Sequence, residues 1–196
     1  MNSQITKNNN VLELGKTYRL AGYDWTACEL INNGKTLVIQ SHGVTSGAWP
    51  GYVMPQFGNG NFYAADIDGE DISAYDDKMQ TLYDAIKDAE DSSASYGKGL
   101  FLISKEKAGF TEWDQPISGD YWQALKKAAG NASSFGCPFN YAWLGTVDGT
   151  GGAWCVFSGG HVYYGGDQNH DFVVAPAFNL DLSKVEVAGD EIVIKS

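Results

Sequence analysis

The sequence predicts a single α+β domain, and three observations carry this prediction. Two stretches, residues 72–89 and 119–129, repeat apolar side chains at helical spacing. Short β-rich runs bounded by Gly, Asn and Pro stand before and after these stretches. No repeat and no linker divides the 196 residues, a length that suits one domain with a substantial core. We therefore expect a polar lead-in over residues 1–10, followed by one domain over residues 11–196.

The first strands are expected over residues 16–20, 25–31 and 36–40, which are rich in β-formers. Asn32-Asn33-Gly34 joins the last two, and Asn-Gly supplies the positive φ that a tight hairpin requires. The following residues 41–61 are irregular and punctuated by Gly and Pro. A loop of this kind usually carries function or is held in place by its aromatic side chains.

The first helix would present one apolar face. Its members are Ile72, Tyr75, Met79, Leu82, Ile86 and Ala89. Ser73 with Asp76 resembles a capping box and predicts that the helix begins at Ser73. Residues 100–103 are apolar and predict a strand, and residues 104–109 could form one helical turn.

The second helix is expected over residues 119–129, with Asp120 or Ser118 as its cap and Gly130 at its end. Its buried side would hold Tyr121, Trp122, Leu125, Ala128 and Ala129.

After Pro138 the sequence predicts β-structure, over residues 141–145, 153–158, 161–164 and 172–178. Gly159-Gly160 suits a hairpin turn, and residues 184–187 and 191–195 predict a closing hairpin. Residues 139–178 hold nine of the 26 aromatic residues, eight of the 24 glycines and no Lys or Arg. This composition is typical of a recognition surface, and its alternative is a set of strands whose aromatics form core.

The net charge of −11 argues against several partners. Arg19 is the only arginine, and residues 66–91 contain ten acids against two lysines, which is −8 of the total. Nucleic acid and anionic membranes need cationic groups, so we expect neither as a partner. No apolar run is long enough to insert into a bilayer. The N-terminus lacks the pattern of a signal peptide, which predicts synthesis in the cytoplasm.

No residue set predicts catalysis, a metal or a cofactor. Counted from Asp66, the sixth and twelfth positions of an EF-hand loop hold Asp71 and Asp77, where Gly and Glu are required. The segment therefore predicts a solvated acidic turn. His42, His161 and His170 have no recognisable nucleophile beside them in a motif. The three cysteines leave a Cys137–Cys155 bridge open, with free thiols favoured.

Three motifs bear on the family. Residues 99–106 read GLFLISKE, residues 141–145 read YAWLG, and residues 173–182 read VVAPAFNLDL. With the order of the parts, they make the chain similar to an uncharacterised C-type-lectin-like family of gut bacteria and phages. That family resembles the variable, ligand-binding proteins of diversity-generating retroelements. It usually carries arginines in the second and third motifs, where this chain has Gly145 and Ala175.

The resemblance implies a C-type-lectin-like fold: two amphipathic helices, small antiparallel sheets and a Gly/aromatic-rich C-terminal β segment. It implies a non-catalytic protein that displays a variable surface to a cell-surface protein or glycan, from a virion or a cell surface. A homo-oligomer stays open. Such a segment is diversified by mutation at adenines.

Within the C-terminal segment, the resemblance separates two groups of residues. Trp143, Leu144, Trp154, Val156, Val173 and Phe178 are expected in the core. The candidate ligand-binding residues are Phe139, Asn140, Asp148, Thr150, Cys155, Phe157, His161, Tyr163, Tyr164, Asp167, Asn169 and His170. Strand alternation supports part of this division, because Trp154 and Val156 would face away from Cys155 and Phe157.

Two other functions of the same fold are alternatives. A calcium-dependent lectin needs a Pro-containing carboxamide motif and a Trp-Asn-Asp triplet, and of these the chain has only the fragment Gln115-Pro116. A formylglycine-generating oxidase needs two copper-binding cysteines close together, for which Cys137 and Cys155 would have to meet.

Overall fold

The computed structural model describes residues 4–7, 10–48, 50, 52–53, 63–64, 67–107, 120–128, 141–147, 153–157, 162–165 and 171–196. This part of the chain is rich in sheet and has two short α-helices, α1 (Asp77–Ile86) and α2 (Asp120–Ala128). The predicted α+β class is therefore confirmed. Within the described ranges, no helix is long and apolar enough to cross a membrane.

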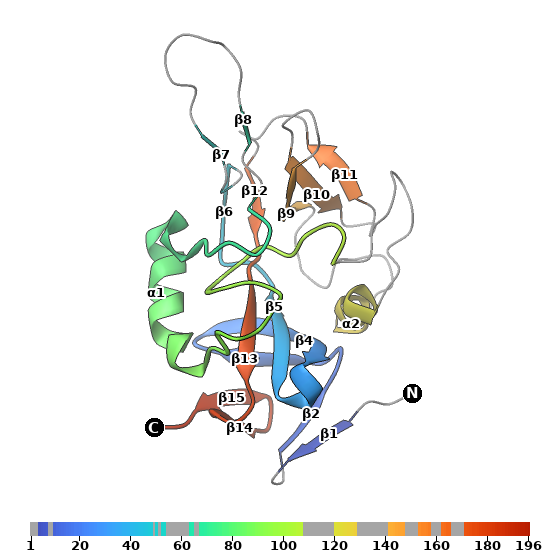
Figure 1. The fold of residues 1–196 in the computed structure, drawn as a ribbon, viewed down its shortest axis with the longest axis vertical. Coiled ribbons are helices and arrows are strands. Elements are labelled where there is room, and N and C mark those ends of the chain that lie inside the picture. The colour runs from blue at the N-terminus through green and yellow to red at the C-terminus, as the bar shows by residue number, and fades with distance from the viewer. Residues whose placement is uncertain are drawn as a thin grey trace.

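A six-stranded sheet lies near both chain termini (Figure 1), and we call it the proximal sheet. Its order is β13 (Ala177–Asp181), β5 (Thr36–Ser41), β4 (Tyr23–Ile31), β3 (Thr17–Leu20), β15 (Glu191–Ile194) and β14 (Val185–Ala188). The predicted hairpins β4–β5 and β14–β15 are both present and antiparallel. At the same end, β1 (Gln4–Lys7) pairs with β2 (Asn10–Glu13), so the lead-in over residues 1–10 contributes strand residues.

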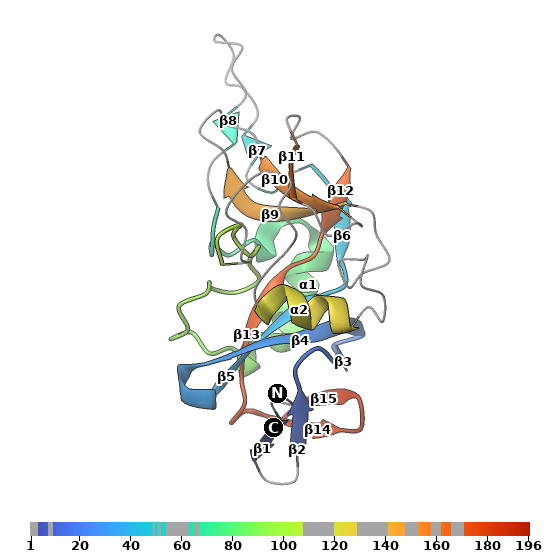
Figure 2. The same cartoon turned by 90° about the vertical axis from the view of Figure 1, so that its right-hand side faces the viewer.

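A five-stranded sheet lies at the opposite end of the molecule (Figure 2), and we call it the distal sheet. Its order is β11 (Val162–Gly165), β10 (Ala153–Phe157), β9 (Tyr141–Val147), β12 (Phe172–Val174) and β6 (Thr45–Gly47). The short pair β7 (Tyr52–Val53) and β8 (Tyr63–Ala64) lies at this same end.

The chain passes between the two sheets twice, from β5 to β6 and from β12 to β13. The Ser41 N–H donates to the Pro176 carbonyl (2.9 Å), and the Val44 N–H donates to the Val174 carbonyl (3.0 Å). The single strand predicted over residues 172–178 is therefore two strands, interrupted at Ala175-Pro176. Proline cannot donate to a ladder, which explains the break.

Local signals set several turns. Asn32, Asn33 and Gly34 form the short 3₁₀ turn η1 (Asn32–Gly34), with φ of 52°, 54° and 79°. Helix α1 begins at Asp77, later than the predicted Ser73, because the Asp76 carboxylate accepts the Met79 N–H at 2.8 Å and acts as the N-cap. Ser73 instead begins the 3₁₀ turn η2 (Ser73–Tyr75). A third such turn, η3 (Lys87–Ala89), follows α1.

The strand predicted over residues 100–103 is wrong. These four residues are buried, but they make only one isolated bridge, between Phe101 and Ala177. Residues 100–103 are therefore apolar because they are buried between other elements, and not because they belong to a sheet.

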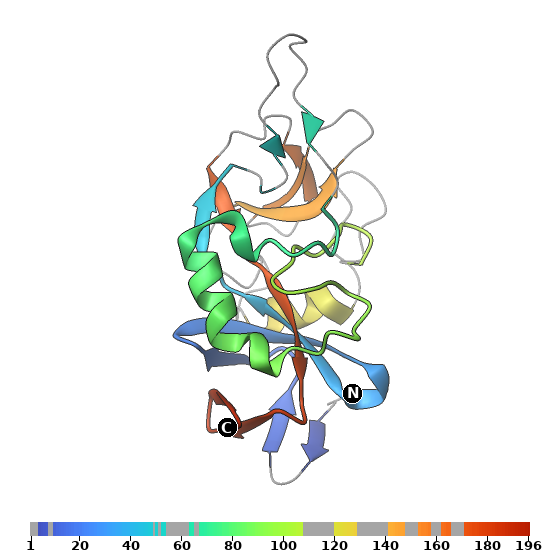
Figure 3. The same cartoon turned by 60° about the vertical axis from the view of Figure 1, so that its left-hand side comes forward.

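The core forms two clusters on the two faces of the proximal sheet. Alternate residues of β5 divide between them, with Leu37 and Ile39 in the first cluster and Val38 in the second. Helix α1 adds Met79, Leu82 and Ile86 to the first cluster. Helix α2 adds Tyr121 and Leu125 to the second. The central strands β4 and β5 therefore lie between the two helices (Figure 3).

Candidate functional site

The distal sheet is the candidate site, because it contains the strands of the Gly/aromatic-rich C-terminal segment. Three separated parts of the chain build it: β6, the run from β9 to β11, and β12. Strand β12 joins these parts, since it pairs with β6 in antiparallel and with β9 in parallel fashion. The sheet lies at the end of the molecule away from β1, β2, β14 and β15 (Figure 2).

Five of the six C-terminal residues predicted to lie in the core are buried. Trp143, Leu144, Trp154, Val156 and Phe178 are buried, and Val173 is half-buried. The Trp143 ring lies 4.5 Å from the Phe172 ring, measured between centroids, and its Nε1–H donates to the Gly47 carbonyl at 3.0 Å. One side chain of β9 thus contacts both β12 and β6.

The prediction that Cys155 is displayed is wrong. Its side chain is fully buried in the first core cluster, whereas Trp154 and Val156 lie in the second. The alternation along β10 is as expected, but both of its faces are covered. Burial raises the pKa of the Cys155 thiol to about 12, so the thiol stays protonated at neutral pH.

Three further candidates lie on described strands, and their backbone register is known. Tyr163 pairs with Cys155, and Tyr164 pairs with Trp154, across β10 and β11. Phe157 pairs with Tyr141 across β10 and β9. Strand β11 forms one edge of the distal sheet, so these residues stand at or next to that edge. The remaining candidates lie outside the described residues: Phe139, Asn140, Asp148, Thr150, His161, Asp167, Asn169 and His170.

Gly145 and Ala175, which stand in the second and third sequence motifs, are both interior. A Cβ atom on Gly145 would stand 2.8 Å from the Leu102 carbonyl oxygen and 3.3 Å from the Asp68 Cα. Ala175 is buried, and its carbonyl accepts a hydrogen bond from the Gln40 side chain. Neither position offers room for a long cationic side chain.

The turn after the apolar run 100–103 supports the end of β9. The Lys105 N–H donates to Thr146 Oγ1 at 2.8 Å, and the Gly145 N–H donates to the Ile103 carbonyl at 2.9 Å. The Lys105 ammonium lies 4.3 Å from the centroid of the Trp154 ring, a cation–π geometry. The GLFLISKE motif therefore serves as a support for β9 and β10.

Tyr75 is a site residue that sequence reasoning assigned only to the buried face of a helix. Its hydroxyl donates to the Ala48 carbonyl at 2.5 Å, directly after β6. Burial, with smaller contributions from Asp76 and Asp171, raises the pKa of this phenol, so it remains a donor. The sequence around Tyr75 could not predict this contact, because Ala48 is 27 residues away along the chain.

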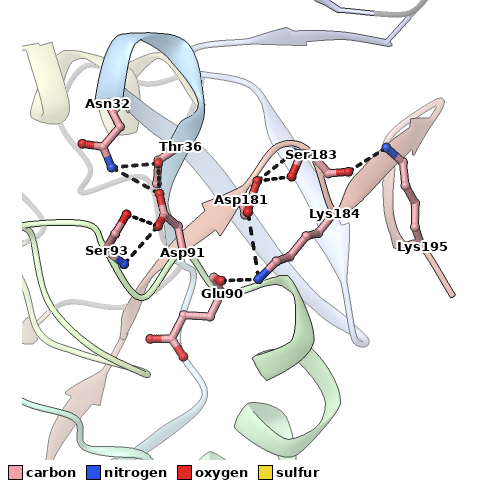
Figure 4. Close-up of polar contacts among 9 residues, drawn as sticks. All are labelled: Asn32, Thr36, Glu90, Asp91, Ser93, Asp181, Ser183, Lys184 and Lys195. Carbon is pink, nitrogen blue, oxygen red and sulfur yellow. Dashed lines mark hydrogen bonds and ion pairs between the residues drawn. The ribbon is translucent and has the colours of Figure 1, made fainter.

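A second polar cluster lies on the proximal side, around Asp91 (Figure 4). The Asp91 carboxylate accepts hydrogen bonds from Ser93 N (3.0 Å), Ser93 Oγ (2.6 Å), Asn32 Nδ2 (3.2 Å) and Thr36 Oγ1. These hydrogen bonds, from Ser93 and Thr36 first, lower the pKa of Asp91 to about 2. Since four donors already occupy the carboxylate, we interpret it as a link between the β4–β5 turn and the chain after α1.

The same region contains a polar hollow of about 410 Å³. It is lined by Lys35, Asp91, Ser93, Asp181, Leu182 and Ser183. Asp181 accepts from Ser183 N at 2.8 Å and Ser183 Oγ at 2.7 Å, and Lys184 donates to the Glu90 carbonyl at 2.8 Å (Figure 4). The Asp181–Ser183 contacts stabilise the β13–β14 turn, and the Lys184–Glu90 contact connects this turn to the chain after η3.

The acidic turn before η2 has structural contacts of its own. Asp68 pairs with Lys107 at 3.4 Å, and Asp71 accepts the Ser73 N–H at 2.8 Å. Across the described ranges, no group of three or more His, Cys, Asp or Glu side chains is placed to hold a metal ion. Asp167, Asn169 and His170 lie outside these ranges.

Comparisons with protein-family models, with curated proteins and with solved structures found no match for this chain.

Proposed function

We propose that this chain is a non-catalytic binding protein with a C-type-lectin-like fold, which displays its C-terminal β segment to a ligand on a cell surface. The observation that carries the proposal is that an aromatic-rich segment without basic residues includes two buried strands. A segment rich in Tyr, Phe, Gly, Asn and His, without Lys or Arg over residues 139–178, is built on the buried strands β9 and β10. Both strands lie at the end of the molecule away from the termini (Figure 1).

Physical chemistry favours recognition by such an arrangement. Aromatic side chains offer a large contact area for few rotatable bonds, and Asn, Ser and Gly adapt their hydrogen bonds to the ligand. Residues carried on strands with a packed interior lose little conformational freedom on binding. The ligand is a cell-surface protein or glycan, and the carrier is a virion or a cell surface.

The two cysteines among the described residues support a non-catalytic role. Reactive cysteines are partly exposed thiolates with a lowered pKa. Burial instead raises the pKa of both Cys28 and Cys155, and both side chains are fully buried. The formylglycine-generating alternative would need Cys155 to leave this environment. Copper binding, with turnover of a cysteine-containing peptide, would favour that alternative.

The test of the proposal is a triple substitution, Phe157→Ala, Tyr163→Ala and Tyr164→Ala. We expect loss of binding to intact bacterial cells that retain the unmodified chain, with a Tm within a few degrees. Trp154→Ala is the matched core control, because Trp154 is buried and should lower Tm strongly. A large loss of Tm in the triple variant would place these three side chains in the core and contradict the proposal.

Two further observations separate the alternatives. Calorimetry that showed sugar binding only with calcium would favour the calcium-dependent lectin. Diversification predicts that the neighbouring DNA holds a reverse transcriptase gene and a near-copy of this segment that differs at adenines. Neighbouring DNA that held neither would contradict diversification. The binding role would still be tested by the cell-binding experiment.

A further inference from the structure

Several polar side chains are buried where the chain passes between the two sheets. We call residues 41–44 and 174–176 the passage, because they lead from β5 to β6 and from β12 to β13. Thr26, Gln40 and Ser41, which lie in or beside it, are at most 2% exposed. A buried polar group is costly unless it has a hydrogen-bond partner. The stability of the passage therefore depends on the hydrogen bonds that these groups make.

His42 connects the first half of the passage to strand β4 by two contacts. Its backbone N–H donates to the Asp24 carbonyl at 2.9 Å, and its ring Nε2 lies 2.8 Å from Thr26 Oγ1. Gly43 follows with a φ of 114°, in the region that favours glycine. His42 therefore attaches the passage to the proximal sheet directly before the chain bends towards β6.

We propose that His42 makes the passage sensitive to pH: the neutral imidazole accepts the Thr26 hydroxyl proton at Nε2, and protonation of the imidazole breaks this contact and opens the passage. In an imidazolium both ring nitrogens are donors, so Thr26 Oγ1 could then only accept. The Thr26 hydroxyl proton would need a new acceptor, at a residue that is 0% exposed and out of reach of water. The inference does not depend on the proposed function.

The charges around the imidazole set the pH range of this response. Burial lowers the pKa of His42, and the Asp24 carboxylate on β4 opposes this effect. Arg19 on β3 weakens the opposition, because its Nη1 lies 3.8 Å from Asp24 Oδ1. On α2, the Lys127 ammonium is paired with Glu13. The stability that neutral His42 contributes is complete above its ordinary pKa of 6.5. It is lost as the pH falls from there through the lower pKa of the folded state.

Two other titratable groups lie on this face of the proximal sheet. Thr26 is opposite Gln40 in the β4–β5 ladder, and Gln40 accepts the Tyr121 hydroxyl of α2. The Cys28 thiol donates to the Thr26 carbonyl at 3.3 Å. Burial raises the pKa of both Tyr121 and Cys28, so both stay protonated at neutral and acidic pH. In this cluster, the charge that changes between pH 7.5 and pH 5 is that of His42.

The experiment measures amide hydrogen exchange by NMR in the full chain at pH 7.5 and pH 5. Each rate is divided by the rate of the unfolded chain at the same pH. The reporters are the Ser41 N–H, which donates to the Pro176 carbonyl, and the Val44 N–H, which donates to the Val174 carbonyl. Their protection should fall at least about threefold at pH 5. The upper limit is about thirtyfold, set by the difference between pH 5 and a pKa of 6.5 in the open state.

A reference amide separates this response from a general effect of acid. The Leu182 N–H donates to the Lys35 carbonyl at 3.0 Å, next to the β4–β5 turn and away from the passage. Its protection should change less than about twofold, because no group of that turn titrates between pH 5 and pH 7.5. An unmodified chain in which Ser41 and Val44 respond no more than Leu182 would overturn the proposal.

Histidine variants assign the response to His42. His42→Gln cannot be protonated, and its amide oxygen can still accept the Thr26 hydroxyl, so the response should disappear. The double variant His161→Gln, His170→Gln is the matched control, because it retains His42 as the only histidine of the chain. It should respond like the unmodified chain. A response that persists in His42→Gln, or that is lost in the double variant, would assign the effect to other groups and overturn the proposal.

Two further variants test the contact itself and keep the test decisive if His42→Gln does not fold. Thr26→Val keeps the shape of the side chain and removes the hydroxyl, so protection of Val44 should already be low at pH 7.5 and fall less than about twofold at pH 5. Asp24→Asn removes the carboxylate that favours the imidazolium, so the response should move to lower pH. A full response in Thr26→Val would overturn the assignment of Thr26 as the partner that protonation displaces.

Discussion

The Tyr121 hydroxyl on α2 donates a hydrogen bond to the side-chain oxygen of Gln40 on β5, in the interior of the protein. The Gln40 amide in turn donates to the Ala175 carbonyl, at the junction of β12 and β13. Tyr121 and Gln40 are both buried. This chain of hydrogen bonds therefore connects α2 to the passage between the two sheets.

Tyr121→Phe should destabilise the protein by about 1–3 kcal/mol, because it leaves the buried Gln40 oxygen without this donor. The free energy of unfolding, measured in urea, checks the value. Tyr83→Phe is the control, since Tyr83 is only half-buried and bonds to Glu90 near the surface. A Tyr121→Phe variant as stable as the control would show that the hydrogen bond to Gln40 contributes nothing.

Protonation of the Asp91 carboxylate should destabilise the protein in acid. Its pKa in the folded state, about 2, lies below the unfolded value of about 4, so its contribution is present above pH 4. The contribution is lost as the pH falls through the folded pKa. Because Asp91 is half-exposed and therefore partly screened by solvent, we expect a loss of only about 1 kcal/mol.

Urea unfolding of the unmodified chain and of Asp91→Asn at pH 5, 4, 3 and 2.5 measures this contribution. The asparagine cannot titrate, so the stability difference between the two proteins should shrink as the pH falls. A difference that stays constant from pH 5 to pH 2.5 would contradict the lowered pKa.

Gly145→Ala should cost about 2–3 kcal/mol, because the new Cβ would stand 2.8 Å from the backbone oxygen of Leu102, which cannot rotate away. Gly22→Ala is the control. Its Cβ meets no atom within 4 Å, and only its φ of 84° costs about 1 kcal/mol. Equal stabilities of the two variants would show that the backbone of residues 100–103 can move away from β9 at little cost in free energy.

The parts of the fold that the sequence predicted are set by local chemistry. Asn32-Asn33-Gly34 determines the β4–β5 turn through three positive φ angles, and the spacing of Met79, Leu82 and Ile86 determines the buried face of α1. The break at Pro176 was not predicted, although it had a local signal, because proline within an apolar run argues against one continuous strand.

The parts that could not be predicted depend on contacts far apart in the sequence. Residues 100–103 have the composition of a strand, and only the surrounding elements decide that they make one bridge. The contacts of Tyr75 with Ala48 and of Trp143 with Gly47 join residues 27 and 96 positions apart. Alternation along β10 separates Cys155 from Trp154, but it cannot show that a second core cluster covers the other face.

The two buried thiols give a test of β10 that needs no ligand. Burial raises the pKa of Cys28 and Cys155, and the Cys28 thiol also donates to the Thr26 carbonyl at 3.3 Å. The thiolate is the reactive form, so neither side chain should react with a disulfide reagent in the folded protein at pH 8.

Mass spectrometry of peptides after a short exposure to the reagent checks each cysteine separately. We expect Cys28 to be modified only after unfolding in urea. For Cys155 the decisive result is modification in the folded state. Rapid labelling there would mean that the side chain faces solvent, as the sequence had predicted, and that β10 exposes one face. Protection of Cys155 would leave residues 153–156 of β10 as buried support and restrict the displayed surface to Phe157, β11 and the residues that connect the distal strands.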